Sequence, residues 1–349
     1  MTRAALPSLS LIVPCRNERD YIGRCLDSIL AQDYPTGRIA EVLVVDGQSD
    51  DGTRGIIDQF AKRNPIVRLV DNPRRIVSAA LNIGIHEAVG EVIVRFDAHA
   101  TYPPTYLSRL VPALKDYGAD NVGGVIATIP ADDSPTAQAI AAALSHPFGV
   151  GDSYFRIGTG EPRWVDTIAF FCCRREVFER VGGFDEELVR GEDCEFNFRL
   201  RDGGGRVLLV PGVEARYYAR RTFGQLVRML FQYGYFKALM MRKMGRVMSV
   251  RQFVPTGLVV ALIGNALLSP WVPPARLLLA LVAGTYAIAL VVSSLHAGKH
   301  RGLRCTMMLP AAFTLMHFSY GIGFLKGIGD HILGYRSRAL PAGAVRLSR

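Results

Sequence analysis

The stretch EVIVRFDAHATYPP, residues 91–104, has the composition of a buried strand that runs directly into polar side chains. Apolar residues dominate positions 92–96, and Asp97 and His99 follow with one small residue between them. Both of these side chains can bind a metal ion. The stretch therefore predicts an interior strand whose carboxyl end is aimed at a ligand.

Similar strands precede it, and segments of helical period separate them. The expected strands are residues 9–14, 41–46, 66–71 and 91–97, and the expected helices are residues 21–30, 53–63 and 77–88. This alternation predicts an α/β fold with a largely parallel sheet and helices on both faces. Ligands of such sheets bind at the carboxyl ends of the strands, which is where PCRNE (14–18), DGQSDDGT (46–53) and DAH (97–99) stand.

A nucleotide fits this edge of the sheet, but a dinucleotide of the dehydrogenase kind does not. Rossmann dehydrogenases carry G-x-G-x-x-G directly after the first strand, whereas the first glycine after that strand here is Gly23. Asp46 could accept hydrogen bonds from a ribose or a base, or simply begin a turn. A diphosphate that is not held by a glycine loop needs another source of positive charge, and a divalent cation bound by Asp97 and His99 would supply it. Carboxylate and imidazole ligands suit Mn²⁺, and carboxylate suits Mg²⁺. The same pair could also be a helix N-cap and a surface histidine.

Charge and hydropathy divide the chain. All but one of the 31 acidic residues precede residue 215, and 18 of the 41 Lys and Arg residues follow it. Three stretches without a charged residue, 253–272, 277–295 and 305–325, each have about the ~20 residues that cross a bilayer. They predict a membrane-attached tail; buried core helices of a soluble protein are the alternative.

The placement of the basic residues argues against a nucleic-acid partner, because they flank apolar spans instead of lining a soluble surface with stacking aromatics. The apolar run at residues 8–14 is too short for a signal peptide, so we expect the first half in the cytoplasm. The six cysteines show no CxxC spacing, and we expect them to be reduced core thiols.

Five segments in order resemble family 2 glycosyltransferases of the GT-A fold. They are LIVPCRNERDYIGRCLDSILAQDYP (11–35), EVLVVDGQSDDGT (41–53), ALNIGIHEAVGEVIVRFDAH (80–99), FFCCRREVFERVGGFDEEL (170–188) and GEDCEFNFRLRDGG (191–204). With YGIGFLKG (320–327), they look most like the branch that extends lipid-linked saccharides for bacterial exopolysaccharides of the succinoglycan kind.

The resemblance implies a division of the chain into four parts. These are a Rossmann-like, mostly parallel GT-A catalytic domain at residues 1–220, basic amphipathic interfacial helices at 221–252, about three transmembrane helices at 253–330 and a basic tail at 331–349. We expect a multi-pass protein of the bacterial plasma membrane with a cytoplasmic catalytic domain.

It also implies a nucleotide and metal site at the strand ends. The implied nucleotide contacts are Pro14, Glu18, Asp46 and Asp97. Asp97 would also hold the metal of the donor diphosphate. The family usually has Asp-x-Asp, and His99 stands at its third position, so the choice between Mn²⁺ and Mg²⁺ stays open. Gly47 stands where a second acid usually follows Asp46.

The acidic pair of RGEDCEFNFRLR (190–201) is the other chemical centre that the resemblance implies. Asp193 would take the proton of the attacking hydroxyl, with Glu192 nearby to orient the acceptor or support Asp193. Such a base contributes about 10²- to 10⁴-fold, because an alcohol is a poor nucleophile until it is deprotonated. Read without the other motifs, the pair could be acids that complement a helix dipole.

The expected activity is inverting, metal-dependent transfer of a hexose from a UDP-sugar such as UDP-glucose to a lipid-linked saccharide on a polyprenyl carrier. It would serve the biosynthesis of an exopolysaccharide or a cell-surface glycan. Two alternatives stay open: transfer of one sugar to polyprenyl phosphate, and a non-catalytic membrane subunit that binds a nucleotide sugar.

Overall fold

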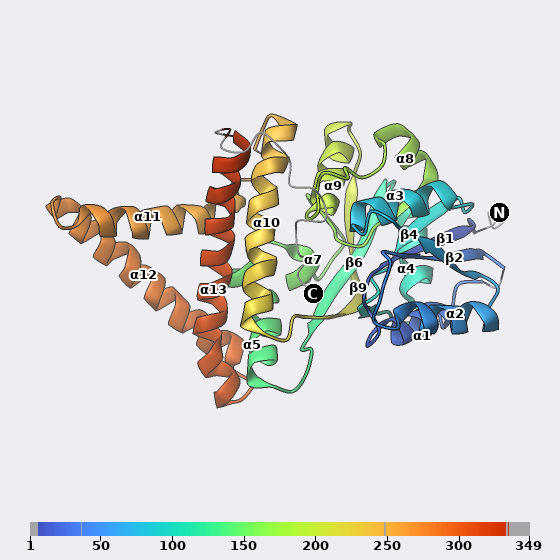
Figure 1. Cartoon of the computed structure of the whole chain (residues 1–349), viewed down its shortest axis with the longest axis horizontal. Coiled ribbons are helices and arrows are strands. Elements are labelled where there is room, and N and C mark those ends of the chain that lie inside the picture. The colour runs from blue at the N-terminus through green and yellow to red at the C-terminus, as the bar shows by residue number, and fades with distance from the viewer. Residues whose placement is uncertain (1–5, 36, 248, 333, 335–349) are drawn as a thin grey trace. The chain divides into compact units, whose positions relative to one another are not determined.

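The computed structural model describes residues 6–35, 37–247, 249–332 and 334 (Figure 1). Its contacts divide the described chain into two compact units. The first unit comprises residues up to 127 together with 157–217, and the second comprises 128–156 together with 218–334. Most of the basic tail predicted at 331–349 lies outside the described residues, and the predicted boundaries at 220, 252 and 330 stay predictions.

A mixed sheet forms the centre of the first unit. In the described residues its order is β3-β2-β1-β4-β8-β6-β9-β5, and β7 pairs with β9. The strands are β1 (Leu9–Cys15), β2 (Ile39–Asp46), β3 (Val67–Asp71), β4 (Val92–Arg95), β5 (Ala100–Thr101), β6 (Asn121–Ile129), β7 (Arg163–Trp164), β8 (Cys172–Arg174) and β9 (Val207–Tyr218). The first four in this order are parallel, and β8 pairs antiparallel with β4.

Three helices of this unit match the segments of helical period at residues 21–30, 53–63 and 77–88. The helices of the first unit are α1 (Ile22–Leu30), α2 (Thr53–Arg63), α3 (Val77–Glu87), α4 (Tyr106–Asp116), α8 (Arg175–Val181) and α9 (Glu192–Asp202), and the short helix α7 (Tyr154–Ile157) falls mostly within the residues of the second unit. Figure 1 shows α1 and α2 on one side of the strands and α3 on the other. The α/β fold with helices on both faces is therefore confirmed, and the continuous apolar runs of β1, β2 and β4 are buried as expected for interior strands.

The register of the parallel strands brings the polar motifs to one edge. Cys15 lies opposite Asp46, which in turn lies opposite Asp71. Ile12 lies opposite Arg95, so the residues that follow β4 emerge beside the end of β1. The carboxyl ends of β1, β2 and β4 therefore carry the three motifs that the sequence singled out.

The second unit is helical. Its helices are α5 (Pro135–Leu144), α6 (Pro147–Val150), α10 (Phe223–Met244), α11 (Val254–Leu268), α12 (Pro273–Gly298) and α13 (Leu303–Gly327), with a 3₁₀ turn at Val250–Phe253 and a π-helical turn at Ile328–Ile332. The buried core of the unit combines alanines of α5 with apolar residues of α10 and α13. Helices α10 and α13 lie side by side (Figure 1).

Glycines allow α10 and α13 to approach closely. A Cβ atom at Gly234 would stand 2.1 Å from the Tyr320 carbonyl oxygen, and one at Gly323 would stand 2.2 Å from the Phe231 carbonyl oxygen. Small residues at such crossings are typical of helices that pack within a membrane.

Three helical segments of the described chain are long and apolar enough to cross a membrane: Val250–Leu268, Pro273–Gly298 and Leu303–Ile332. Large apolar side chains on α11 and α12 are exposed, among them Leu267, Leu277 and Ile288. A helix that is apolar all round suits a lipid environment. The three predicted apolar segments are therefore helical, except that residues 269–272 of the first lie in the turn after α11, and the third continues through Pro310 without a break.

Candidate active site

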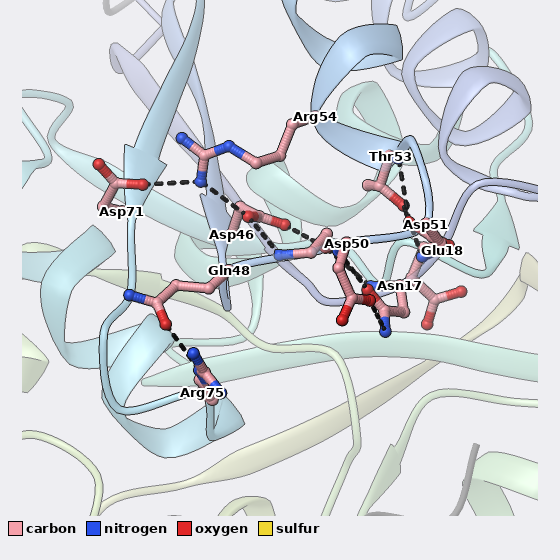
Figure 2. Close-up of polar contacts among 11 residues, drawn as sticks. Asn17, Glu18, Asp46, Gln48, Asp50, Asp51, Thr53, Arg54, Asp71 and Arg75 are labelled. Atoms are coloured by element: carbon pink, nitrogen blue, oxygen red, sulfur yellow. Dashed lines mark hydrogen bonds and ion pairs between the residues drawn. The ribbon is translucent and has the colours of Figure 1, made fainter.

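The loops that follow β1 and β2 are held together by hydrogen bonds (Figure 2). The Asn17 backbone N–H donates to Ser49 Oγ at 2.8 Å. The Asn17 side-chain amide donates to Asp50 Oδ1 at 2.9 Å and accepts from the Asp50 backbone N–H at 3.1 Å. The Glu18 backbone N–H donates to Thr53 Oγ1 at 2.9 Å. These contacts fix the backbone from which Glu18 projects.

Asp46 is fully buried, and both of its carboxylate oxygens have partners. The carboxylate accepts from the backbone N–H of Ser49 at 3.0 Å, from the Ser49 hydroxyl, and from Arg54 Nη1 at 2.9 Å. Arg54 also donates to Asp71 at the end of β3 at 2.7 Å (Figure 2). Asp46 thus organises the loop after β2, and its nucleotide contact stays a prediction.

Gly47 follows Asp46 where the family usually has a second acid. A Cβ atom here would stand 3.2 Å from Cβ and Cδ of Arg16, closer than side chains normally approach. The Gly47 backbone N–H donates to the Cys15 carbonyl at 2.8 Å. The absence of a side chain lets the loops after β1 and β2 run this close.

Asp51 supports the same loops, and Asp51→Asn should weaken them. Its carboxylate accepts from the Thr53 hydroxyl at 2.6 Å, from the Thr53 N–H at 3.0 Å and from the Arg19 N–H at 3.2 Å. Burial by itself would raise the pKa of this carboxyl, but these hydrogen bonds outweigh burial and lower the pKa overall. We expect the variant to lose about 1 kcal/mol at pH 7, because a hydrogen bond to a charged group is the stronger kind.

The pH dependence of this loss follows from the direction of the shift. A folded-state pKa below the ordinary value of about 3.9 means that the contribution is present above about pH 4 and is lost as the pH falls through the folded pKa. Thermal unfolding should place Asp51→Asn about 2–4 °C below wild type at pH 7, with a smaller gap below pH 4. An equal gap at both pH values would contradict this account.

Asp97 and His99 lie in the turn between β4 and β5. The Asp97 backbone N–H donates to the hydroxyl of the buried Tyr102 at 2.7 Å, which fixes the turn. His99 Nδ1 lies 3.1 Å from Glu18 Oε1, and its imidazole packs edge-on against the ring of Tyr217 with 4.8 Å between the ring centroids. The structure therefore brings together Glu18, Asp97 and His99, which the sequence assigned to one site.

The donor types at this turn fit a divalent cation that takes its other ligands from a substrate. Glu18 Oε1 contacts Nδ1 of His99, as a carboxylate commonly does for a metal-binding histidine, so a metal ion on this imidazole would take Nε2. Within the described residues no group of three or more His, Cys, Asp or Glu side chains could hold a metal. Mg²⁺ sites of phosphate-binding enzymes often use only one or two protein ligands together with phosphate oxygens.

Arg95, the last residue of β4, connects this turn to the acidic pair. Its side chain is buried, Nε donates to Asp97 Oδ1 at 3.0 Å, and Nη1 donates to Glu192 Oε1 at 3.1 Å. Burial by itself would lower the pKa of Arg95, but the carboxylates of Asp97, Glu192 and Asp193 raise it overall. Our sequence reasoning missed this residue. The available signal was a charged side chain inside the otherwise apolar run VIVRF.

The acidic pair begins α9. Gly191 precedes the helix in the left-handed conformation with φ 80°, which a glycine adopts without strain. Burial raises the pKa of Glu192, Arg95 opposes this, and Asp193 adds to it, so that the pKa is raised overall. Asp193 is half-buried, and its Oδ1 accepts from the Cys194 backbone N–H at 2.8 Å. Glu192 is therefore buried and paired with Arg95, whereas the adjacent Asp193 is only half-buried.

A packed aromatic cluster and two polar clamps position α9. The cluster consists of Phe171, Phe178, Phe184 and Phe196, with Phe184 and Phe196 stacked at 4.8 Å between ring centroids. Asn82 of α3 exchanges two hydrogen bonds with the backbone of Phe184, at 2.7 and 2.9 Å. Arg199 of α9 donates to the carbonyls of Val181 and Gly183. The turn at Gly182 and Gly183 ends α8 and is fixed against α9 by these bonds.

Pro14 lies in β1 opposite Val45, one residue before the strand ends. The structure thus places Pro14, Glu18, Asp46, Asp97, His99, Glu192 and Asp193 in the first unit, at or after strand ends or at the start of α9. The roles of these residues stay predictions.

Comparison with known proteins agrees with this fold. A model of the family described as glycosyl transferase family 2 matches residues 10–182. The succinoglycan biosynthesis protein ExoA of Rhizobium meliloti (strain 1021) is 34% identical over 247 residues, which are 70% of this chain and 73% of that protein. The dolichyl N-acetyl-alpha-D-glucosaminyl phosphate 3-beta-D-2,3-diacetamido-2,3-dideoxy-beta-D-glucuronosyltransferase of Methanococcus voltae is 25% identical over 328 residues, 92% of this chain and 97% of that one.

Among solved structures, the mannosyltransferase PcManGT from Pyrobaculum calidifontis, in complex with GDP-Man and Mn²⁺, matches with a TM-score of 0.59 and 22% identity, covering 94% of this chain and 88% of that one. A likeness at this identity shows the fold. Together with the sheet order and the sequence match, it shows that this chain belongs to glycosyltransferase family 2 and has the GT-A fold.

Proposed function

We propose that this chain is an inverting, metal-dependent glycosyltransferase that moves a hexose from a UDP-sugar to a lipid-linked saccharide in exopolysaccharide or cell-surface glycan biosynthesis. The observation that carries this function is the contact of one buried arginine, Arg95, with both Asp97 and Glu192. The turn proposed for the donor diphosphate and the acids proposed for the acceptor then belong to one centre.

The reaction would be a single displacement at C1 of the donor sugar. The acceptor oxygen forms a bond to C1 while Asp193 takes its proton, and the bond from C1 to the diphosphate breaks, so that the nucleoside diphosphate leaves with the electron pair. Inversion converts an α-linked donor into a β-linked product. Glu192, held by Arg95, orients the acceptor or supports Asp193. Proton transfer to a placed base supplies about 10²- to 10⁴-fold.

The donor diphosphate requires positive charge on the opposite side of the sugar. Asp97 and the Nε2 face of His99 would hold the divalent cation, and Glu18 would keep the imidazole in the required orientation. When bound, the cation would neutralise the charge that develops on the leaving diphosphate. The Mn²⁺ of the solved mannosyltransferase supports this assignment. Pro14 of β1 and Asp46 at the end of β2 would complete the nucleotide site. Figure 2 shows Asp46 and the loops beside it.

The proposed acceptor follows from the second unit and from the relatives. Three helices long enough to cross a membrane would keep the enzyme beside a polyprenyl carrier. The names of two relatives refer to succinoglycan biosynthesis and to a sugar linked through phosphate to dolichol. A bacterial plasma membrane with a cytoplasmic catalytic unit would accommodate both substrates.

Nucleoside diphosphate release by the detergent-purified full chain tests this function. A panel of nucleotide sugars is offered with polyprenyl-linked saccharides or with polyprenyl phosphate, in the presence of Mn²⁺, Mg²⁺ or EDTA. We expect release with one UDP-hexose, dependent on a lipid-linked saccharide and abolished by EDTA. Release with polyprenyl phosphate alone would identify the simpler transferase, and binding of a nucleotide sugar without turnover on any acceptor would identify a non-catalytic subunit.

A further inference from the structure

Arg220 is a buried cation whose charge the described residues leave uncompensated. It lies between the end of β9 and the start of α10, only 5% of it is exposed, and Nε and Nη1 are buried without a hydrogen-bond partner. The preceding Ala219 packs into the apolar core of the second unit. A guanidinium stays protonated at any ordinary pH, and burial of an unpaired charge is unfavourable. An anion bound to the guanidinium of Arg220 would remove this unfavourable contribution.

The neighbouring arginine, Arg221, is exposed to solvent and paired with a carboxylate, as is usual for arginine. Arg221 has a side chain that is 62% exposed, and its Nε lies 2.9 Å from Asp132 Oδ2. Most other acids of the second unit are paired as well, Asp152 with Arg251 and Asp330 with Lys326. The remaining one, Asp133, is exposed to solvent. No described carboxylate of this unit is thus placed to neutralise Arg220.

The chemistry at Arg220 favours a phosphate group. Guanidinium presents a planar set of donors that matches phosphate oxygens. Arg220 also stands two residues before Thr222, the N-cap residue of the 22-residue helix α10. The positive end of a long helix adds to the attraction for an anion. The Thr222 hydroxyl and the Gln225 side chain cap this helix end, which fixes the backbone next to Arg220.

We propose that Arg220 binds a phosphate group of a substrate, in the unit that carries the apolar helices. This inference rests on the proposed function, in which the lipid-linked acceptor and the nucleotide donor both carry phosphate. Either source would place the same chemistry on the guanidinium, and separate probes distinguish them. Farnesyl diphosphate represents the lipid source, farnesol is the same chain without phosphate, and UDP represents the donor.

The experiment compares Arg220→Met with the matched control Arg221→Met in the detergent-purified full chain. Affinities for the three probes are measured by titration, and thermal unfolding is followed with and without them. We expect Arg220→Met to bind farnesyl diphosphate at least about 10-fold more weakly, because it loses charge-assisted hydrogen bonds. Arg221→Met should bind like wild type, and farnesol should bind equally to all three proteins. A loss confined to UDP would assign the same phosphate site to the donor.

Thermal unfolding separates a binding role from a structural one. If the guanidinium is a binding group for phosphate, Arg220→Met without ligand unfolds at the same temperature as wild type or higher, and farnesyl diphosphate raises the unfolding temperature of wild type and of Arg221→Met more than that of Arg220→Met. Unchanged affinity for both phosphate probes in Arg220→Met, or a wild type that binds neither, overturns the inference. Sugar transfer by wild type is measured independently, so the proposed function can stand when this inference fails.

Discussion

Asp193→Asn should lower kcat for sugar transfer by about 10²- to 10⁴-fold, while the KM for the nucleotide sugar changes little. Asparagine keeps the size of the side chain and an oxygen that can accept from the Cys194 backbone N–H, so the start of α9 keeps its geometry. It cannot take the proton of the acceptor hydroxyl. Steady-state release of nucleoside diphosphate, with the donor and the acceptor varied in turn, measures both constants.

Asp202→Asn is the matched control, because Asp202 is an exposed acid at the far end of the same helix. It should retain wild-type kcat. Retention of more than about half of kcat by Asp193→Asn, under conditions where wild-type turnover depends on metal and acceptor, would assign the base to another residue. An equal loss in both variants would show that the helix had been disturbed.

The parallel part of the fold could be predicted because its signals are local. Each strand from β1 to β4 is a short apolar run, and each following helix repeats at a helical period within about a dozen residues. Parallel strands then bring their carboxyl ends to one edge, so Asp46 and Asp97 could be assigned to that edge before any contact was known. The membrane segments were also predictable, because length and the absence of charge suffice.

Side-chain partners within the site could not be predicted in the same way. Glu18 and His99 are 81 residues apart, and Arg95 and Glu192 are 97 apart. Each pair depends on how loops and antiparallel strands return to the sheet, which periodicity does not encode. Asp46 illustrates the same limit, because its environment depends on Ser49 and Arg54. The sequence predicted which residues are polar at the sheet edge, whereas the structure determines what each of them contacts.

Arg95→Met should destabilise the first unit strongly. The substitution keeps much of the apolar stem but leaves the buried Glu192 carboxylate without its cation. Breaking a buried ion pair on one side costs about 3–5 kcal/mol, because the remaining charge stays desolvated. For a unit of this size the unfolding temperature should fall by roughly 6–20 °C. Circular dichroism or differential scanning fluorimetry of the purified chain measures this shift.

A double-mutant cycle distinguishes charge compensation from simple loss of packing. Glu192→Gln combined with Arg95→Met removes the uncompensated carboxylate, so the double variant should be more stable than Arg95→Met alone. Strictly additive losses would contradict a role for the pair. Arg95→Lys keeps the positive charge but changes its geometry. The planar guanidinium of Arg95 reaches Asp97 and Glu192 through separate nitrogens, whereas lysine has a single ammonium nitrogen. A stable Arg95→Lys protein with kcat lowered about 10-fold or more would show that the site needs both acids held in one geometry, because charge alone would then be insufficient.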